Sequence, residues 1–365
     1  MQNVLSYVKL RRDIPFKYAP FNEVDALALA AVAHLDFTGL FKEKASLEEA
    51  IQLYKENEKV RNLDEHHKAE YMELLTLMAG SPRYKKIKMY NPVVDINKEE
   101  TKTFYGLTYY LSGHRAIVMF RGTDSSLLSW KENFTFAYKN DAEGMIEALK
   151  YAGEVFKKPF MKGIIMGHSK GGGLAVFASA SFEAKLRKKI KKVLVFDGPG
   201  FAGDLAETEG YRDIEDRIEA FVPVECVVGN MFRPSYKRKI VAAFGDQLEQ
   251  HEVINWSCSA RGFELAGDTS ESSKELSERI NLWIESVPVE KREGVINELF
   301  NIFSDNNIEY VSDFERMDIT KFVGIAVRLP GLSKPLKELL GIILEHRKRL
   351  KNIEKDLRTK KKEKN

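Results

Sequence analysis

Residues 167–175, GHSKGGGLA, place a serine between glycines at the junction of two different kinds of sequence. The run before them, KGIIM, is apolar enough for a buried strand, and the run after them, VFASASFEA, consists of small and apolar residues. Glycines at such a junction can serve two chemistries. They can cradle a phosphate at a helix N-terminus, or they can permit the sharp turn that exposes a nucleophilic serine.

A phosphate-binding loop requires the pattern G-x-x-x-x-G-K-[S/T]. Counted from Gly167, the second glycine falls on Gly172, but Gly173 and Leu174 stand where the lysine and the hydroxyl residue belong. The residues from Gly167 onward read G-x-S-x-G instead, with a predicted strand before and a predicted helix after. This context favours a nucleophile elbow, with Ser169 as the nucleophile.

A serine hydroxyl is a weak nucleophile at neutral pH and needs a base, which in turn needs an acid to orient it. In this class of site the chain order is serine, acid, histidine. Only His251 and His346 come after Ser169. His346 lies among cations in LEHRKRL, which is typical of a solvated helix, whereas His251 lies in a loop-like stretch after the predicted strand KRKIVAAF. His251 is therefore the predicted base.

The acid has two candidates. Asp197 ends the predicted strand VLVFD, the next strand after the serine, and Glu225 ends a later one, FVPVE. Because the carboxyl ends of parallel strands meet at one edge of a sheet, either carboxylate could reach the base. Asp197 is the first choice and Glu225 is the alternative.

The oxyanion of an acyl-transfer intermediate needs two N–H donors. One is expected to be the backbone N–H of Lys170, the residue after the nucleophile. The other is expected from Thr123 or Asp124, in the stretch MFRGTDSSLLSW after an earlier strand. Gly122 would permit a close approach of that loop, and Arg121 is expected to brace it by pairing with a carboxylate.

Two aromatic side chains are candidates for the wall of a substrate pocket. Trp130 follows the expected oxyanion loop, and His168 directly precedes the serine, with its ring expected to point away from the serine side chain. The sequence implies no metal or cofactor, since Cys226 and Cys258 alone cannot form a four-ligand zinc set.

The elements that would position these residues follow from the hydrophobic periodicity. Helical spacing dominates from Asn22, a predicted N-cap, and two later β-rich runs predict a hairpin. A predicted helix over 141–157, a strand over 162–166 and a helix over 171–183 then begin an alternation of strands and helices. This alternation predicts an α/β fold with a mostly parallel central sheet flanked by helices.

From about residue 270 the pattern is helical to the C-terminus. We therefore expect a catalytic domain over 1–270 and a helical C-terminal extension over 271–365. Residues 347–365 hold ten Lys/Arg and three Asp/Glu, a net charge of +7, although the whole chain carries only +3. Such a tail is typical of a solvated helix end, and it offers a weak electrostatic contact with an anionic membrane surface.

The composition argues against several other classes of protein. Of the 365 residues, 44% are hydrophobic and 30% charged, as in ordinary globular proteins, and no run reaches the ~18 apolar residues of a membrane span. The N-terminus lacks the apolar segment and cleavage site of a secretory signal, so a cytoplasmic location is expected. The body has no basic stripe interleaved with aromatic residues, so no nucleic-acid partner is expected.

Taken together, these stretches resemble a known family. FRGTDSSLLSWKENF is similar to the FRGT…W segment of the fungal-type class 3 lipases. With GHSKGGGLA, FDGPGF and QHEVINW, it resembles their bacterial relatives, a lipase-like α/β-hydrolase family, over about residues 20–300. The resemblance implies an α/β-hydrolase fold, Ser169 as nucleophile, His251 as base, and Thr123 or Asp124 in the oxyanion loop.

One departure from the family pattern concerns the acid. In class 3 lipases the acid follows a later strand in a D-x-V-P-like sequence, whereas the matching region here reads ECVVG, with Cys226 at the acid's place. This departure favours Asp197, whose position after its strand is similar to that in pancreatic-type lipases.

The sequence thus predicts a serine hydrolase that acts on carboxylic esters through an acyl-enzyme, with a small-molecule or lipid ester as substrate. A thioesterase or acyltransferase with the same triad is one alternative. The other is a lipase-like scaffold without activity that serves as a binding module through its helical C-terminus.

Overall fold

The computed structural model describes residues 2–57, 67–124, 126–139, 141–201, 203–310 and 331–363, with the side chains of residues 112, 247, 248 and 350 onward left undescribed. Most of the basic tail, for which a membrane contact is predicted, therefore lies outside the described side chains.

The centre of the molecule is a sheet in which eight described strands lie side by side in sequence order. Neighbours from β1 to β4 pair antiparallel, and neighbours from β4 to β8 pair parallel. The strands are β1 (Ala45–Ser46), β2 (Lys88–Asn97), β3 (Lys102–Ser112), β4 (Arg115–Phe120), β5 (Lys162–His168), β6 (Ile190–Phe196), β7 (Ile218–Pro223) and β8 (Arg238–Val241). A small separate sheet pairs β9 (Cys258–Ser259) with β10 (Gly262–Phe263).

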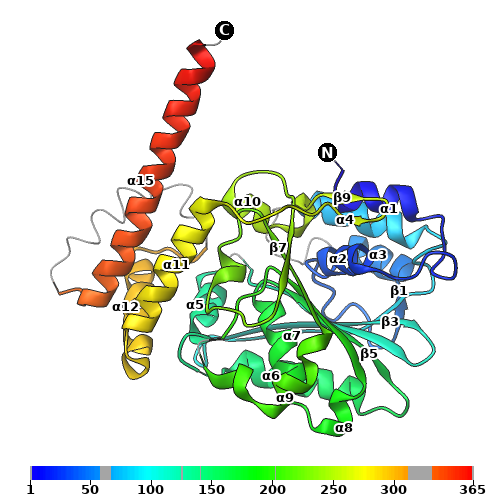
Figure 1. Cartoon of the computed structure of the whole chain (residues 1–365). Coiled ribbons are helices and arrows are strands. Elements are labelled where there is room, and N and C mark those ends of the chain that lie inside the picture. Colours follow the sequence, from blue (N-terminus) through cyan, green and yellow to red (C-terminus); the bar gives the residue numbers. More distant parts are fainter. Residues whose placement is uncertain are drawn as a thin grey trace.

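Helices cover both faces of the sheet, with α6, α7 and α9 on one side and α1 to α4 on the other (Figure 1). The helices are α1 (Val4–Arg11), α2 (Glu23–Val32), α3 (Leu47–Glu56), α4 (Lys68–Ala79), α5 (Leu127–Thr135), α6 (Glu143–Phe156), α7 (Lys170–Ser181), α8 (Ala184–Arg187), α9 (Glu209–Ile214), α10 (Gln247–His251), α11 (Glu271–Ser286), α12 (Val289–Asp305) and α15 (Lys334–Glu363).

The sequence of β4 explains why both faces are covered. Its side chains alternate between two hydrophobic cores, because Val118 and Phe120 pack under α6 and α7 while Ile117 and Met119 pack under α2. A strand with apolar side chains on both faces needs a layer on each. The mostly parallel sheet flanked by helices confirms the predicted fold class, that of an α/β-hydrolase.

Some local predictions are confirmed and others need correction. Asn22 caps α2 in a capping box with Asp25, as its position at the start of the helical pattern suggested. Strand β2 was missed because Asn91, at a φ of 51°, and Pro92 interrupt its alternation and shift its register. Helices α1 and α5 were also missed. The stretch at His251, expected to be a loop, is the short helix α10.

The described part of the C-terminal region is helical and packs against α5. The N–H of Leu127 donates to the carbonyl of Glu309 at 2.8 Å, and Arg292 donates to the carbonyl of Ala137 at 2.7 Å. Helix α15 extends away from the body (Figure 1). The division into domains at residue 270 stays a prediction. Among the described helices, none combines the length and the apolar character needed to cross a membrane.

Candidate active site

Ser169 joins β5 to α7 in a backbone conformation that L-residues rarely adopt, with a φ of 54° and a ψ of −129°. Such a conformation costs of order 1–3 kcal/mol, so the surrounding structure must hold it in place. Ser169 N–H donates to the carbonyl of Phe196 at 2.9 Å, and Gly172 N–H donates to the carbonyl of Ser169 at 2.8 Å. This strained strand-to-helix turn has the backbone geometry expected of a nucleophile elbow.

The neighbouring glycines are required because main-chain segments approach one another closely. A Cβ on Gly167 would lie 2.0 Å from the carbonyl oxygen of Gly171, and a Cβ on Gly171 would lie 2.0 Å from that of Phe120. A Cβ on Gly172 would lie 3.0 Å from the Cα of Gly198, in the loop after β6. The consecutive glycines therefore let α7 begin directly against β4 and the loop after β6.

Asp197 and His251 lie together although 54 positions separate them in the chain. Asp197 directly follows β6, His251 ends α10, and Nδ1 of His251 lies 2.6 Å from Oδ2 of Asp197. The Asp197 side chain is 1% exposed, whereas that of His251 is 18% exposed. The carboxylate is thus sealed behind an imidazole that solvent can reach.

Further donors keep Asp197 ionised. Its Oδ1 accepts hydrogen bonds from the Cys226 thiol at 3.0 Å and from the Gly229 N–H at 3.1 Å. Burial, the largest influence, acts to raise the pKa of Asp197, but the hydrogen bond and charge of His251, with the Cys226 hydrogen bond, lower it overall. Burial and the Asp197 charge raise the pKa of Cys226 well above its usual range, so the thiol stays protonated as a donor.

The contact between Nδ1 of His251 and the Asp197 carboxylate fixes the tautomer of His251. Because an ionised carboxylate only accepts hydrogen bonds, Nδ1 carries the proton and Nε2 presents its lone pair. Burial acts most strongly and lowers the pKa of His251, but the hydrogen bond and charge of Asp197, with the charge of Glu252, leave that pKa raised above the ordinary 6.5. Within the described residues Nε2 has no hydrogen-bond partner, and it does not bond to the Ser169 hydroxyl. Hydrogen bonds between a catalytic base and its nucleophile often form fully only when substrate binds.

Glu225, the alternative acid, lies elsewhere. Its carboxylate accepts a hydrogen bond from the Ser270 hydroxyl at 2.7 Å, and its N–H donates to Oε1 of Gln250 at 3.0 Å. In the described part of the chain no hydrogen bond joins it to His251. Of the two carboxylates, the structure brings only Asp197 to the predicted base.

His168 supports the main chain at His251 and is buried rather than lining a pocket. It is 3% exposed, and its Nε2 lies 2.9 Å from the carbonyl oxygen of His251. Since a carbonyl only accepts, Nε2 is the donor, and the ring is neutral because burial lowers its pKa to about 3. The side chain thus holds the residue predicted to be the base.

The N–H groups expected to form an oxyanion hole belong to Lys170 and to the loop after β4. In the described ranges, the backbone N–H groups of Thr123, Asp124 and Lys170 have no acceptor. Lys170 begins α7, where helix geometry leaves the first N–H groups free. A Cβ on Gly122 would lie 2.9 Å from the Cβ of Ser169, so the loop that carries Thr123 and Asp124 packs against the serine.

Side-chain hydrogen bonds hold that loop in place. Asn133 of α5 donates to the Thr123 hydroxyl at 2.6 Å. The Asp124 carboxylate accepts from the Tyr105 hydroxyl at 2.5 Å and from the Ser126 N–H at 2.9 Å. Burial acts to raise the pKa of Asp124, but the hydrogen bonds from Ser126 and Tyr105 lower it overall. The Asp124 side chain is therefore occupied with the loop itself, which leaves its N–H as the group available to a substrate.

The Lys170 side chain forms a buried ion pair that the sequence does not predict. Its Nζ lies 2.5 Å from Oε2 of Glu132 and 2.7 Å from the hydroxyl of Thr103, and the two charged side chains are 0% and 1% exposed. The N–H of Thr103 donates to the same Glu132 oxygen at 2.9 Å. The pair thus joins the start of α7 to α5, which follows the expected oxyanion loop, and to β3, whose Tyr105 hydroxyl donates to Asp124 of that loop.

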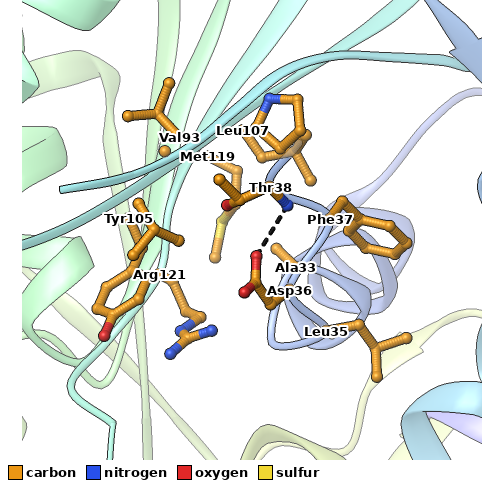
Figure 2. A pocket seen from close by; sticks show the side chains of 13 residues that line it. Ala33, Leu35, Asp36, Phe37, Thr38, Val93, Tyr105, Leu107, Met119 and Arg121 are labelled. Atoms are coloured by element: carbon orange, nitrogen blue, oxygen red, sulfur yellow. Dashed lines mark hydrogen bonds between the residues drawn. The ribbon is translucent and has the colours of Figure 1, made fainter. Parts of the chain in front are cut away.

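A pocket lies between the segment after α2 and strands β2, β3 and β4, and it includes Arg121, directly after β4 (Figure 2). Arg121 lines it and forms no ion pair within 4 Å of a carboxylate among the described residues, but its charge helps to lower the pKa of Asp124 in the expected oxyanion loop. The guanidinium carbon instead lies 3.8 Å from the centre of the Tyr105 ring. Trp130, expected in a pocket wall, is not among the residues lining this pocket and packs, partly buried, against the core from α5.

A second glycine-rich stretch, GPGFAG at residues 198–203, matches the G-x-G-x-x-G pattern after β6. A dinucleotide site would need an α-helix to open at that pattern. The chain continues instead into a short 3₁₀ turn, Asp204–Glu207, and a Cβ on Gly200 would lie 2.6 Å from the carbonyl oxygen of Phe232. These glycines therefore serve close main-chain packing.

Cys226 and Cys258 are buried free thiols. Over the described ranges, no group of three or more His, Cys, Asp or Glu side chains is arranged to hold a metal ion.

The fold and the arrangement at its carboxyl edge define the class of protein, an α/β-hydrolase with lipase-like relatives. The model of the Mbeg1-like family matches residues 78–301, more than half of the chain, so this protein belongs to the lipase-like Mbeg1-like family. The match includes the elbow, both candidate acids and His251. No protein of curated function matches the chain. Among solved structures, the crystal structure of M37 lipase is similar at 14% identity and a TM-score of 0.37, over 57% of this chain and 70% of the other.

Proposed function

We propose that this protein is a serine hydrolase of carboxylic esters that works through an acyl-enzyme. The observation that carries the proposal is the 2.6 Å contact between His251 and Asp197, in the same site as a strained turn that holds Ser169 at a φ of 54°. A buried ionised acid, an imidazole whose Nε2 has no hydrogen-bond partner among the described residues, and a serine on a strained turn form the set that activates a hydroxyl for acyl transfer. Membership of a lipase-like family supports the same reaction class.

In the first half of the reaction, Oγ of Ser169 attacks the acyl carbon while Nε2 of His251 takes the hydroxyl proton. The Asp197 carboxylate stabilises the imidazolium that forms. The carbonyl oxygen becomes an oxyanion, which the N–H of Lys170 and the N–H of Thr123 or Asp124 receive, each donor contributing about 3 kcal/mol. The C–O bond of the ester then breaks, and the leaving alcohol takes the proton from His251.

The second half repeats these steps with water as the nucleophile. His251 removes a proton from water as the water oxygen attacks the acyl carbon, the same N–H groups receive the oxyanion, and Ser169 leaves with the proton. The net result is one ester and one water converted to one acid and one alcohol. Each step uses only this chain's own side chains and backbone.

A panel of 4-nitrophenyl esters and acyl-CoA thioesters, with and without an alcohol acceptor, tests the proposal. We expect ester turnover with a burst of nitrophenol, and loss of both in Ser169→Ala. Faster turnover of the thioesters, or transfer to the alcohol, would assign the thioesterase or acyltransferase alternative. The binding-module alternative rested on an unclear acid, and the hydrogen bond between Asp197 and His251 weighs against it.

A further inference from the structure

Two hydrogen bonds to the Asp197 carboxylate come from one loop, residues 226–232, which lies between β7 and β8. The Cys226 thiol and the Gly229 N–H both donate to Oδ1, at 3.0 and 3.1 Å. The fit is tight, because a Cβ on Gly229 would lie 2.4 Å from that oxygen and 3.0 Å from Sγ of Cys226. A small displacement of the loop would therefore either push the carboxylate or take its donors away.

Asp197 depends on such support because its own backbone is strained. Its φ is 47°, a value that residues other than glycine rarely adopt, and such a conformation persists only where the surroundings hold it. Its N–H donates to the carbonyl of Phe221 in β7 at 2.8 Å, which fixes the main chain. In the part of the chain that the structure describes, the side chain has hydrogen bonds only with His251, Cys226 and Gly229.

Asn281 of α11 holds the other end of this loop. It is 5% exposed, its Oδ1 accepts from the N–H of Phe232 at 2.9 Å, and its Nδ2 donates to the carbonyl of Asn230 at 2.9 Å. Phe232 has a φ of 59°, so the loop is strained at a residue that Asn281 holds. One buried amide thus ties two main-chain positions of the loop to α11, which lies among the C-terminal helices (Figure 1).

Hydrogen bonds inside the loop connect this end to the donors of Asp197. Nδ2 of Asn230 donates to the carbonyl of Cys226 at 2.8 Å, and Arg238 of β8 donates to the carbonyl of Gly229 at 2.7 Å. Asn230 therefore links Asn281 to Cys226, because its main chain bonds to the first and its side chain to the second. A shift of Asn230 would reach the thiol and the N–H that hold the carboxylate.

We infer that Asn281 is a positioning residue for the proposed ester hydrolysis. Among the described residues it has no hydrogen bond with Ser169, His251 or Asp197. It acts by holding loop 226–232, which in turn holds the Asp197 carboxylate against His251. The inference rests on the proposed function and deepens it, since it gives α11, in the predicted C-terminal extension, a part in aligning the acid and the base.

Steady-state hydrolysis of a 4-nitrophenyl ester by two variants tests the inference. Asn281→Ala removes both hydrogen bonds to the loop, and Asn281→Gln carries the amide one methylene further out, where it displaces the loop. We expect each to lower kcat at least about tenfold and to leave KM within about threefold, because misplaced catalytic groups slow the chemical step without weakening substrate binding. Thermal unfolding shows which variants are folded at the assay temperature, and Asn281→Gln serves if Asn281→Ala is not.

A double-mutant cycle separates positioning of the acid from a general loosening of the fold. In Asp197→Ala there is no carboxylate to hold, so adding Asn281→Ala should lower kcat by less than about twofold. A general loosening would lower kcat by the same factor in the wild-type and Asp197→Ala backgrounds.

Glu278→Gln is the matched control, because Glu278 lies on the same helix and its exposed carboxylate pairs with Arg233, the residue after the loop. It should keep kcat within about twofold of the wild type. Wild-type kcat in every folded Asn281 variant, or an equal loss in the Asp197→Ala background, would overturn the inference and leave the proposed function standing. Absence of Ser169-dependent turnover in the wild type would refute the proposed function and this inference with it.

Discussion

Replacing Asp197 with asparagine should do more than remove a charge, because the structure dictates how the new amide must lie. In the native site Oδ1 accepts from both the Cys226 thiol and the Gly229 N–H, at 3.0 and 3.1 Å. An asparagine keeps those two bonds only if its carbonyl oxygen occupies that side. Its NH₂ group then faces Nδ1 of His251, which must become an acceptor. The proton moves to Nε2, and the imidazole can no longer take the proton of Ser169.

The expected loss of activity is therefore the one that results when the histidine base is held in the wrong tautomer. In serine hydrolases this substitution lowers kcat on the order of 10⁴-fold, equivalent to about 5.4 kcal/mol in the activation barrier. The side chain stays nearly isosteric, so the unfolding transition should move little. The assay is steady-state hydrolysis of a 4-nitrophenyl ester by Asp197→Asn, with circular dichroism to verify folding.

Glu225→Gln provides the matched control, since Glu225 also follows a strand at the same edge but bonds to Ser270. It should keep activity within about threefold of the wild type. If Asp197→Asn retained a tenth or more of the wild-type kcat, or if Glu225→Gln lost as much as Asp197→Asn, the assignment of the acid would be refuted.

Three further predictions concern pH and stability. The kcat/KM for esters should rise with pH as His251 loses its proton, and because its pKa is raised, the half-maximal value should lie above pH 6.5; a midpoint at or below 6.5 would contradict this. Lys170→Met should lower the free energy of unfolding by about 3–5 kcal/mol in urea, because it leaves the buried charge of Glu132 without its partner. Adding Glu132→Leu to the same chain should recover most of that loss. A cost under ~1 kcal/mol for Lys170→Met alone would count against the buried pair. Gly171→Ala should lower the free energy of unfolding by roughly 2–4 kcal/mol, because the new Cβ would clash with a backbone carbonyl. The control Gly267→Ala, whose Cβ would lie in open space, should change it by less than about 0.5 kcal/mol. Equal effects of the two substitutions would argue against the close packing at the serine turn.

The serine turn could be predicted from sequence because its signal is local. Glycines two positions before and after Ser169, with an apolar run on one side and small residues on the other, are enough to indicate a strand, a sharp turn and a helix. His251 followed by elimination, since one other histidine comes later and lies among cations.

The acid could not be decided from sequence because Asp197 and Glu225 both follow strands that end at the same edge. Only the packing of α10 settles which one the imidazole meets. Cys226, which stands at the acid's place in the family pattern, lies next to Asp197 and donates its thiol hydrogen to the Asp197 carboxylate. A sequence pattern gives no indication of such a contact between separate loops.

The partners of the buried charged side chains could not be predicted from the sequence either. A lysine at the start of a helix is usually solvated, and Lys170 is buried only because Glu132, 38 positions earlier, lies opposite it. Arg121 was expected to pair with a carboxylate; it forms no close ion pair among the described residues, its charge acts on Asp124, and its guanidinium lies over the Tyr105 ring of β3. Both outcomes depend on how α5 and β3 pack around the elbow, and α5 was not predicted.

The most direct test of the central claim is to treat the folded protein with a fluorophosphonate and locate the adduct by mass spectrometry of its peptides. We expect one phosphonylated residue, Ser169, with no labelling of Ser169→Ala and strongly slowed labelling of His251→Ala. Labelling at another serine, or equal labelling of the Ser169→Ala protein, would contradict it.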